Sequence, residues 1–160
     1  MQNRQIILGK LPQGKLTVDC FQTHETPMPI PGPREVLLRT LYVPLDAASR
    51  AWMQGVTYRS GLQPGDIMAA TTLAEVVTSR SPLLAAGDIV LAETGWQTFT
   101  ALPAAEALKQ PDIVPHTHLL SVYGVPGLTA YFGLLECGRP KADETVVISA
   151  AAGARSEEHT

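Results

Sequence analysis

Hydrophobic and polar residues form six short runs along the first hundred positions, separated by turns that contain Pro or Gly. Runs of this length, apolar or alternating and bounded by turn residues, are typical of β-strands. Their spacing indicates a mainly β domain in the form of a partly open barrel. We predict its strands at residues 5–8, 16–21, 35–43, 73–78, 89–92 and 97–102.

The segment 45–53, LDAASRAWM, has the spacing of a short helix, with Leu45 and Trp52 on one side. Asp46 stands near the helix start, where its carboxylate can accept hydrogen bonds from the first turn. A polar, glycine-flanked loop follows at residues 54–61. Because loops on a barrel rim are good places for substrate contact, this segment and loop are candidates for a binding site.

The stretch 123–137 is apolar at helical spacing and carries a single charge, Glu136. Pro126 is tolerated in a first turn, and Gly138 with Pro140 forms a stop signal. The pattern therefore predicts a helix of about four turns. A helix with so little charge is expected to be covered on more than one side.

Residues 145–149, TVVIS, form an apolar run without alternation. This pattern is typical of a parallel strand that is buried on both faces. The AAAGA segment at 150–154 follows, and such small side chains let backbone amides approach the oxygens of a pyrophosphate. Only one glycine of a G-x-G-x-x-G pattern is present, so spacing alone equally allows a plain apolar strand with a small-residue turn.

Composition and charge exclude several classes of protein. Hydrophobic residues make up 45% of the chain and charged residues 17%, which fits a folded globular protein. The net charge of −3 gives no general attraction to nucleic acid or to an anionic membrane. The sequence has no apolar run of about 18 residues and no signal-peptide core, so we expect a cytoplasmic protein. Cys20 and Cys137 lie in unlike contexts, which predicts two buried thiols instead of a disulfide or a metal pair.

Several segments together resemble the zinc-independent medium-chain dehydrogenases/reductases, specifically the NADPH-dependent alkenal and prostaglandin reductase branch. The resemblance runs from Asn3-Arg4-Gln5-Ile6 through residues 35–41 and Gly95-Trp96-Gln97 to the stretch 123–154. It implies a GroES-like domain at residues 1–120. It also implies that residues 121–154 are the first helix and strand of a truncated NADP-binding Rossmann (α/β) domain. The chain would then be the N-terminal half of a two-domain enzyme.

The last six residues, 155–160, stand where this family has the rest of its glycine-rich turn. Their sequence, RSEEHT, resembles the conceptual translation of a common sequencing adapter. We therefore expect this tail to be an assembly artefact. An ordinary polar C-terminus is the alternative.

The resemblance also implies where a substrate pocket lies. Leu45, Asp46, Arg50 and Met53 match the family's L-D-P-Y-M-R-G-R-M motif, and Thr57-Tyr58 matches a Ser-Tyr pair in the loop beyond it. The implied substrate-lining residues are Asp46, Arg50, Tyr58 and Trp96.

Two departures from the motif and three alternative interpretations qualify that pocket. Ala47 and Ala48 replace the Pro and Tyr of the motif, which predicts a wider pocket. Trp52 can be interpreted as a core residue and Arg50 as a member of a surface ion pair. Tyr58 can equally be a structural residue or a site residue.

The chemistry that the resemblance implies is zinc-free. In zinc-dependent relatives a Cys near 45–46 and a His-Glu pair near 66–69 bind the metal, whereas Leu-Asp and Asp-Ile-Met-Ala occupy these positions here. The implied reaction is hydride transfer from NADPH to the double bond of an α,β-unsaturated aldehyde or ketone, which requires a positioned cofactor and a stabilised enolate oxygen. The implied cofactor-binding residues are Thr129, Ala152, Gly153 and Ala154, and the catalytic groups are expected in the missing second half.

For the longer protein, the resemblance implies a homodimer that acts on small molecules, and the present chain by itself is expected to be inactive. The alternative function is a non-enzymatic GroES-like module for binding or structure. The apolar helix and the Ala-rich strand end argue against that alternative, since a separate barrel has no use for half a nucleotide fold.

Overall fold

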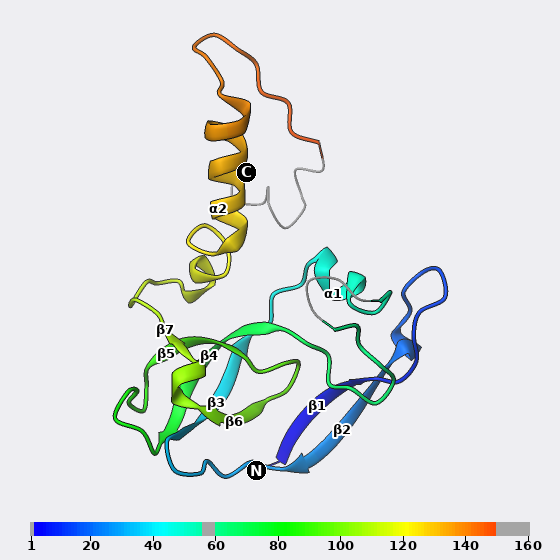
Figure 1. The fold of residues 1–160 in the computed structure, drawn as a ribbon, viewed down its shortest axis with the longest axis vertical. Helices are drawn as coiled ribbons and strands as arrows, with labels where there is room; N and C mark the ends of the chain where they lie inside the picture. The colour runs from blue at the N-terminus through cyan, green and yellow to red at the C-terminus, as the bar shows by residue number, and fades with distance from the viewer. Residues whose placement is uncertain (1, 56–59, 150–160) are drawn as a thin grey trace. The chain divides into compact units, whose positions relative to one another are not determined.

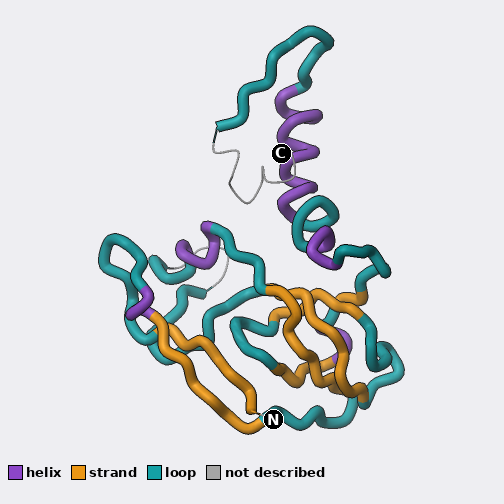
Figure 2. The backbone as a smooth tube through the Cα atoms, turned by 180° about the vertical axis from the view of Figure 1, so that it is seen from behind, coloured by secondary structure: helices purple, strands orange, loops and turns teal. Residues whose placement is uncertain are grey.

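The computed structural model describes residues 2–55 and 60–149, whose path is drawn in Figure 1. The chain divides into two compact units, one that ends at Pro111 and one that begins at Asp112. Strands belong to the first unit, and the longest helical segment belongs to the second, as the orange and purple segments of Figure 2 show. Within the described residues, no helix is both long enough and apolar enough to cross a membrane.

The first two strands form an antiparallel hairpin. Strand β1 (Gln2–Leu8) pairs with β2 (Phe21–Pro27) in a register that joins Gln2 to Pro27 and Leu8 to Phe21. The predicted strand at 16–21 is wrong, because Val18–Cys20 form a 3-10 turn (η1). The backbone amide of Cys20 donates to the carbonyl of Thr17 at 3.1 Å, which turns the chain before β2 begins.

The remaining strands form one antiparallel sheet in the order β6-β3-β4-β5-β7. Four of them lie where the apolar or alternating runs predict strands, because their inward side chains share one apolar core. The core residues include Val36, Leu38, Ala74, Val76, Val90 and Leu102. The strands are β3 (Glu35–Tyr42), β4 (Thr71–Ser79), β5 (Ile89–Glu93), β6 (Phe99–Pro103) and the two-residue β7 (Leu108–Lys109), with a 3-10 turn, η2 (Ala104–Glu106), before β7.

Strand β1 connects the hairpin to the rest of the barrel. The amide of Ile6 donates to the carbonyl of Trp96 at 2.9 Å, and the carbonyl of Ile6 accepts from the amide of Met68 at 2.9 Å. A second core cluster of Leu8, Met53 and Met68 lies beside these bonds. The two sheets are therefore joined by backbone hydrogen bonds, which confirms the mainly β, barrel-like first unit.

The predicted helix at 45–53 is shorter than expected, as α1 (Ala47–Ala51). Asp46 is its N-cap, and its Oδ1 accepts from the amides of Ala48 at 2.9 Å and Ser49 at 3.3 Å. At its end the amide of Trp52 still donates four residues back, to the carbonyl of Ala48, whereas that of Met53 donates three residues back, to Arg50, which tightens the last turn.

The second unit contains the predicted apolar helix. After a 3-10 turn, η3 (His116–Leu119), helix α2 (Val125–Tyr131) begins and continues as a π-helical segment, η4 (Phe132–Gly138). Arg139 ends it in a left-handed conformation with φ of 48°. The location of the helix is as predicted, although its second half has the wider π-helical hydrogen bonding.

Two expectations for the second unit are wrong. The helix is not covered, since Val125 is 71% and Leu128 55% exposed, and Cys137 is exposed with it. Residues 145–149 do not form a strand. Both results have one physical reason: a parallel strand and an apolar helix need neighbouring strands to pair with and pack on. The described part of the second unit contains no strand.

Candidate functional site

The chain between β5 and β6 makes a tight turn that presents Trp96. Gly95 has φ of 69°, and a Cβ at this position would lie 3.0 Å from both the carbonyl oxygen of Met68 and the Cγ2 of Ile67. Trp96 then binds through its backbone, its amide donating to the carbonyl of Met68 at 2.7 Å. A residue with a side chain would be strained and crowded at Gly95, so the turn requires glycine.

A polar network holds this turn against β1. The Oε1 of Gln97 accepts from the side-chain amides of Asn3 at 3.0 Å and Gln5 at 2.8 Å. The Nε2 of Gln97 donates to the carbonyl of Thr94 at 2.7 Å. Asn3, which is 3% exposed, also accepts from the amide of Phe99 at 2.9 Å. Because all these polar groups are paired, the Gly95-Trp96-Gln97 turn is fixed from both sides.

Buried threonines support the same turn from the sheet. The hydroxyls of Thr72 and Thr94 lie 2.6 Å apart, and that of Thr94 donates to the carbonyl of Gly95 at 3.0 Å. The hydroxyl of Thr40 lies 3.4 Å from that of Thr94. These hydroxyl contacts therefore link the loop that bears Trp96 to strands β3 and β4.

The indole of Trp96 packs between the hairpin and the second core cluster. Its ring stacks on that of Phe21, with centroids 5.9 Å apart and an angle of 21° between the planes. It also packs against the cluster of Leu8, Met53 and Met68. Its Nε1 is buried and has no hydrogen-bond partner among the described residues. The ring is therefore held by apolar packing and not by its polar edge.

Trp96 lines a pocket of about 580 Å³ that lies wholly within the first unit. Leu45, at the pocket's edge, is 70% exposed. Five of its lining residues are apolar: Ile6, Leu41, Val43, Leu45 and Trp96. Neutral polar side chains from Thr23, Thr40, Gln97 and Thr98 complete the lining, and Arg4 supplies its single charge. This Trp96 pocket can take an apolar molecule that has a polar end.

Of the four side chains expected to line a substrate pocket, Trp96 lines this one. The carboxylate of Asp46 accepts hydrogen bonds within α1, next to Leu45 in the chain. Arg50 donates to the carbonyl of Gly14, in the loop between β1 and β2, and no ion pair joins it to another described residue. Its second terminal nitrogen is buried without a partner among the described residues. Tyr58 lies outside the described residues.

Trp52 is 8% exposed, which agrees with its interpretation as a core residue. Arg4, Ile6, Leu41 and Val43 were not expected in a site. Alternation along β1 could have found two of them, because Arg4 and Ile6 are two positions apart on a strand and so share a face. No local pattern marks Leu41 and Val43, which reach the pocket through the tertiary fold.

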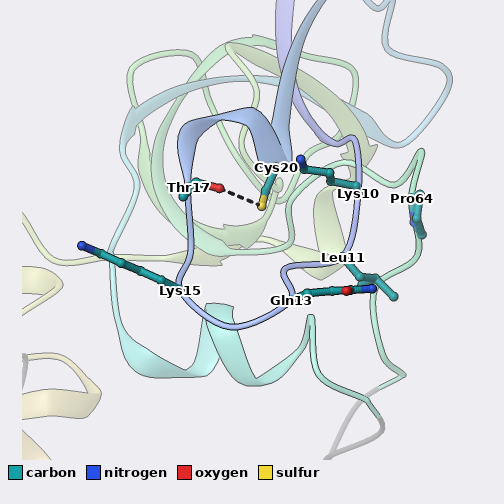
Figure 3. Close-up of a pocket in the computed structure, with 7 residues that line it drawn as sticks. All are labelled: Lys10, Leu11, Gln13, Lys15, Thr17, Cys20 and Pro64. Carbon is teal, nitrogen blue, oxygen red and sulfur yellow. Dashed lines mark hydrogen bonds between the residues drawn. The ribbon is translucent and has the colours of Figure 1, made fainter.

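A second pocket, of about 430 Å³, lies beside the loop that follows β1 (Figure 3). Cys20 is 2% exposed there, and its Sγ lies 3.7 Å from the hydroxyl of Thr17. Lys10 forms an ion pair with Asp19; this hydrogen bond raises the pKa of Lys10 and lowers the pKa of Asp19. In Figure 3 the side chain of Lys15 points away from the thiol. Burial of Cys20 is as predicted.

Of the residues expected at a cofactor, one can be placed. Thr129 is exposed on α2, and its hydroxyl donates to the carbonyl of Val125 at 2.7 Å. Ala152, Gly153 and Ala154 lie outside the described residues, as does the tail 155–160. Among residues 2–55 and 60–149, no three His, Cys, Asp or Glu side chains are grouped so that they could hold a metal ion.

Residues 4–110 match a protein family described as the N-terminal domain of oxidoreductase, and this match ends at the boundary of the first unit. The chain is 36% identical over 154 residues to the NADPH-dependent curcumin reductase of Escherichia coli (strain K12), covering 95% of this chain and 45% of that protein. It is 41% identical over 125 residues to prostaglandin reductase 1 of Bos taurus, covering 75% of this chain and 36% of that protein.

Among solved structures, CurA of Vibrio vulnificus in complex with NADPH is similar, with a TM-score of 0.85 and 35% identity. The match covers 96% of this chain and 46% of the CurA chain. The present chain thus spans less than half the length of each of these proteins.

Proposed function

Because the chain belongs to the oxidoreductase family that has this N-terminal domain, we propose that it is the N-terminal part of an NADPH-dependent reductase. The proposed reaction is hydride transfer from NADPH to the carbon–carbon double bond of an α,β-unsaturated aldehyde or ketone. Relatives named for NADPH-dependent reduction of curcumin, a conjugated enone, and for reduction of prostaglandins support this reaction. The proposal concerns the longer protein, since the chain covers under half of those relatives.

The observation that carries the proposal is the Trp96 pocket. An enone or enal consists of an apolar skeleton and one carbonyl oxygen, and the pocket is lined by apolar residues such as Trp96 and Leu45 as well as by neutral polar ones. Burial of carbon skeleton against such a wall stabilises a complex by about 25 cal/mol per Å². The polar network around Gln97 keeps the turn that carries Trp96 in place.

We propose that the reaction is zinc-free. The positions that hold metal ligands in zinc-dependent relatives carry side chains with other structural tasks here. Asp46 caps α1, Met68 is buried in a core cluster, and Asp66 accepts from the amide of Gln63 at 2.7 Å. Addition of hydride to a conjugated double bond needs stabilisation of an enolate oxygen, which hydrogen-bond donors can supply without a metal.

The cofactor would be held by the second unit and by the part of the longer protein beyond it. Thr129 fits a place beside the cofactor, because its hydroxyl is exposed and its oxygen can still accept a hydrogen bond. When bound, NADPH supplies the hydride. The turn formed by Ala152, Gly153 and Ala154 would border the pyrophosphate, as small residues allow.

We further propose that the longer protein is a cytoplasmic homodimer and that the 160-residue chain is inactive alone. The apolar side chains exposed on α2 and η4, such as Leu128 and Phe132, support inactivity, because a nucleotide fold would cover them. We expect the chain to be poorly soluble and not to bind NADPH. Nucleotide fluorescence in a titration with NADPH checks this, and micromolar binding by a monomeric chain would contradict it.

The decisive assay follows NADPH oxidation by the product of the complete gene, with enones, enals and simple alcohols, in the presence and absence of a strong chelator. We expect turnover of enones and enals that is insensitive to chelation. Activity confined to alcohols, or activity that a chelator removes and zinc restores, would contradict the proposal. Tyr58→Phe and Trp96→Ala variants then show whether these side chains affect substrate choice.

A further inference from the structure

The pocket in Figure 3, which we call the Lys15 pocket, is lined by positive charge. Its volume is about 430 Å³, and both charged residues among its described lining residues, Lys10 and Lys15, are lysines. Small-molecule sites commonly have volumes of about 300–1,000 Å³. None of the described residues that line it also lines the Trp96 pocket, so the two are separate places on the first unit.

Asp19 is the acidic residue bonded to this lining, and both of its carboxylate oxygens are occupied. Its Oδ2 accepts from the ammonium of Lys10, and its Oδ1 accepts from the hydroxyl of Thr17. This network compensates one lysine only, because the side chains of Gln13 and Lys15 form no hydrogen bond or ion pair with the described residues. The ammonium of Lys15 stands on a flexible four-carbon stem, so it can turn toward a ligand in the pocket.

Arg50, on α1, holds the loop that borders the pocket. Its Nη2 donates to the carbonyl of Gly14, which lies between Gln13 and Lys15 in the chain. Gly14 has φ of 87°, so Arg50 holds the loop where its backbone turns, and it thereby positions the side chains on either side. The Nη1 of Arg50 is buried without a hydrogen-bond partner among the described residues. Two positive charges, on Lys15 and Arg50, therefore lack an anionic partner in the described part of the chain.

We propose that the Lys15 pocket binds an organic phosphate, with its phosphate on Lys10 and Lys15 and its apolar part on Leu11. A phosphate monoester carries a charge of about −1.5 to −2 at pH 7, which matches two uncompensated positive charges. Its three terminal oxygens are strong acceptors, which suits ammonium groups and the side-chain amide of Gln13. Arg50 is then a positioning residue for this site.

The test uses three ligands that share a benzene ring and differ in charge: phenyl phosphate, benzenesulfonate and phenol. Each is titrated by calorimetry into the 160-residue chain without NADPH, so the result does not depend on whether the longer protein is a reductase. We expect phenyl phosphate to bind at least about tenfold more tightly than phenol, with benzenesulfonate between them, because electrostatic attraction grows with ligand charge. Raising the salt concentration should weaken the binding of the two anions and leave that of phenol unchanged.

Variants test the role of each charge. Lys15→Gln and Arg50→Gln should each weaken phenyl phosphate binding by about fivefold or more. Arg50→Lys should regain part of the loss, since an ammonium can still donate to the carbonyl that Arg50 holds. Asp19→Asn should strengthen binding, because it releases the ammonium of Lys10. The matched control is Lys109→Gln, since Lys109 lies on β7, pairs with Asp88 and is not among the residues that line the pocket.

The thiol of Cys20 reports where the ligand binds. It lines the pocket and is 2% exposed, whereas Cys137 is exposed. In a Cys137→Ser chain, bound phenyl phosphate should slow the reaction of Cys20 with a small thiol reagent, in proportion to the occupancy measured by calorimetry. Phenol at the same concentration should have much less effect.

Four outcomes would overturn the inference: no binding of phenyl phosphate, equal affinity for phenyl phosphate and phenol, binding that survives both Lys10→Gln and Lys15→Gln, or binding that leaves the reaction of Cys20 unchanged. Thermal unfolding of each variant shows whether the barrel still forms. The comparison of the three ligands uses the unsubstituted chain, so it tests the inference even where a substitution prevents folding.

Discussion

The side-chain amide of Asn3 donates to the Oε1 of Gln97, 94 positions later in the chain, at 3.0 Å. The two residues belong to the hairpin strand β1 and to the turn before β6. The bond thus joins the first strand to the loop that presents Trp96. The position of Trp96, and with it the pocket that Trp96 lines, therefore depends on where strand β1 lies.

Replacing Asn3 should therefore destabilise the first unit. Asn3→Ala leaves the amide of Phe99 without its acceptor and removes one donor from Gln97, which costs about 1–3 kcal/mol for buried groups. Denaturant unfolding followed by tryptophan fluorescence measures the loss. The neighbouring exposed residue gives the control, because Gln2→Ala should change stability by less than about 0.5 kcal/mol. Equal effects of the two substitutions would show that the network adds no stability.

Gly95→Ala should be more harmful than the same substitution at another glycine with positive φ. Both Gly95 and Gly65 have positive φ, so the alanine of each variant adopts a left-handed backbone conformation that lowers stability by about 1–2 kcal/mol. Gly65 has open space around its missing Cβ, whereas Gly95 does not, and crowding adds about 1–3 kcal/mol. Unfolding midpoints of the two variants provide the comparison. We expect Gly95→Ala also to shift the emission of Trp96, and an identical loss at both sites would contradict the crowding.

Two substitutions of Asp46 can show whether its side chain only caps α1 or also contacts the substrate. Asp46→Ala should cost about 1 kcal/mol because the amides of Ala48 and Ser49 lose their acceptor, whereas Asp46→Asn should retain most of the cap. Unfolding of both variants tests the structural role. In the longer enzyme, a residue that only caps α1 should leave kcat/KM unchanged in Asp46→Asn. A large drop in kcat/KM for this variant, without a loss of stability, would instead indicate substrate contact.

Asp88 should make stability depend on pH in the acid range. The amide of Ala85 and then the ammonium of Lys109 hold the pKa of Asp88 below its usual value of 3.8. A lowered pKa in the folded state means that the stabilisation is complete above pH 3.8 and is lost as the pH falls below it. Asp88→Asn should therefore destabilise the chain at neutral pH, by an amount that shrinks as the pH falls below 3.8.

Lys109→Gln is the matched control for Asp88. It removes the ion pair and keeps the bond from Ala85, which is the larger cause of the lowered pKa, so most of the acid dependence should persist. Urea unfolding midpoints across the acid range measure both variants. A variant Asp88→Asn with the same acid dependence as the unsubstituted chain would contradict this assignment.

The sequence predicted the strands that carry apolar runs and failed where backbone pairing alone makes a strand. Strands β3, β4, β5 and β6 each contribute apolar side chains to one core. Strand β2, with the sequence FQTHETP, is exposed along most of its length and is a strand because β1 offers it hydrogen bonds. Its polar residues carry no periodic apolar signal, so the pattern instead favoured the apolar residues just before it.

The candidate site was predictable only in part. Trp96 was expected there because the Gly95-Trp96-Gln97 segment resembles the reductase family. Its apolar and charged neighbours come from β1, β3 and the segment after β3, and only the fold brings these segments together. The error at residues 145–149 has a different cause. An apolar run of this kind is typical of a buried parallel strand, and the described part of the second unit contains no strand with which it could pair.

Strand β3 lies between β4 and β6 in the sheet, and β6 comes last of the three along the chain. During synthesis, one edge of β3 therefore stays open until residue 103 has left the ribosome. At about 5–20 residues per second this wait lasts several seconds. For that period the nascent barrel exposes the apolar Val36-Leu37-Leu38 segment on a strand with one open edge, and such an edge can pair with another chain.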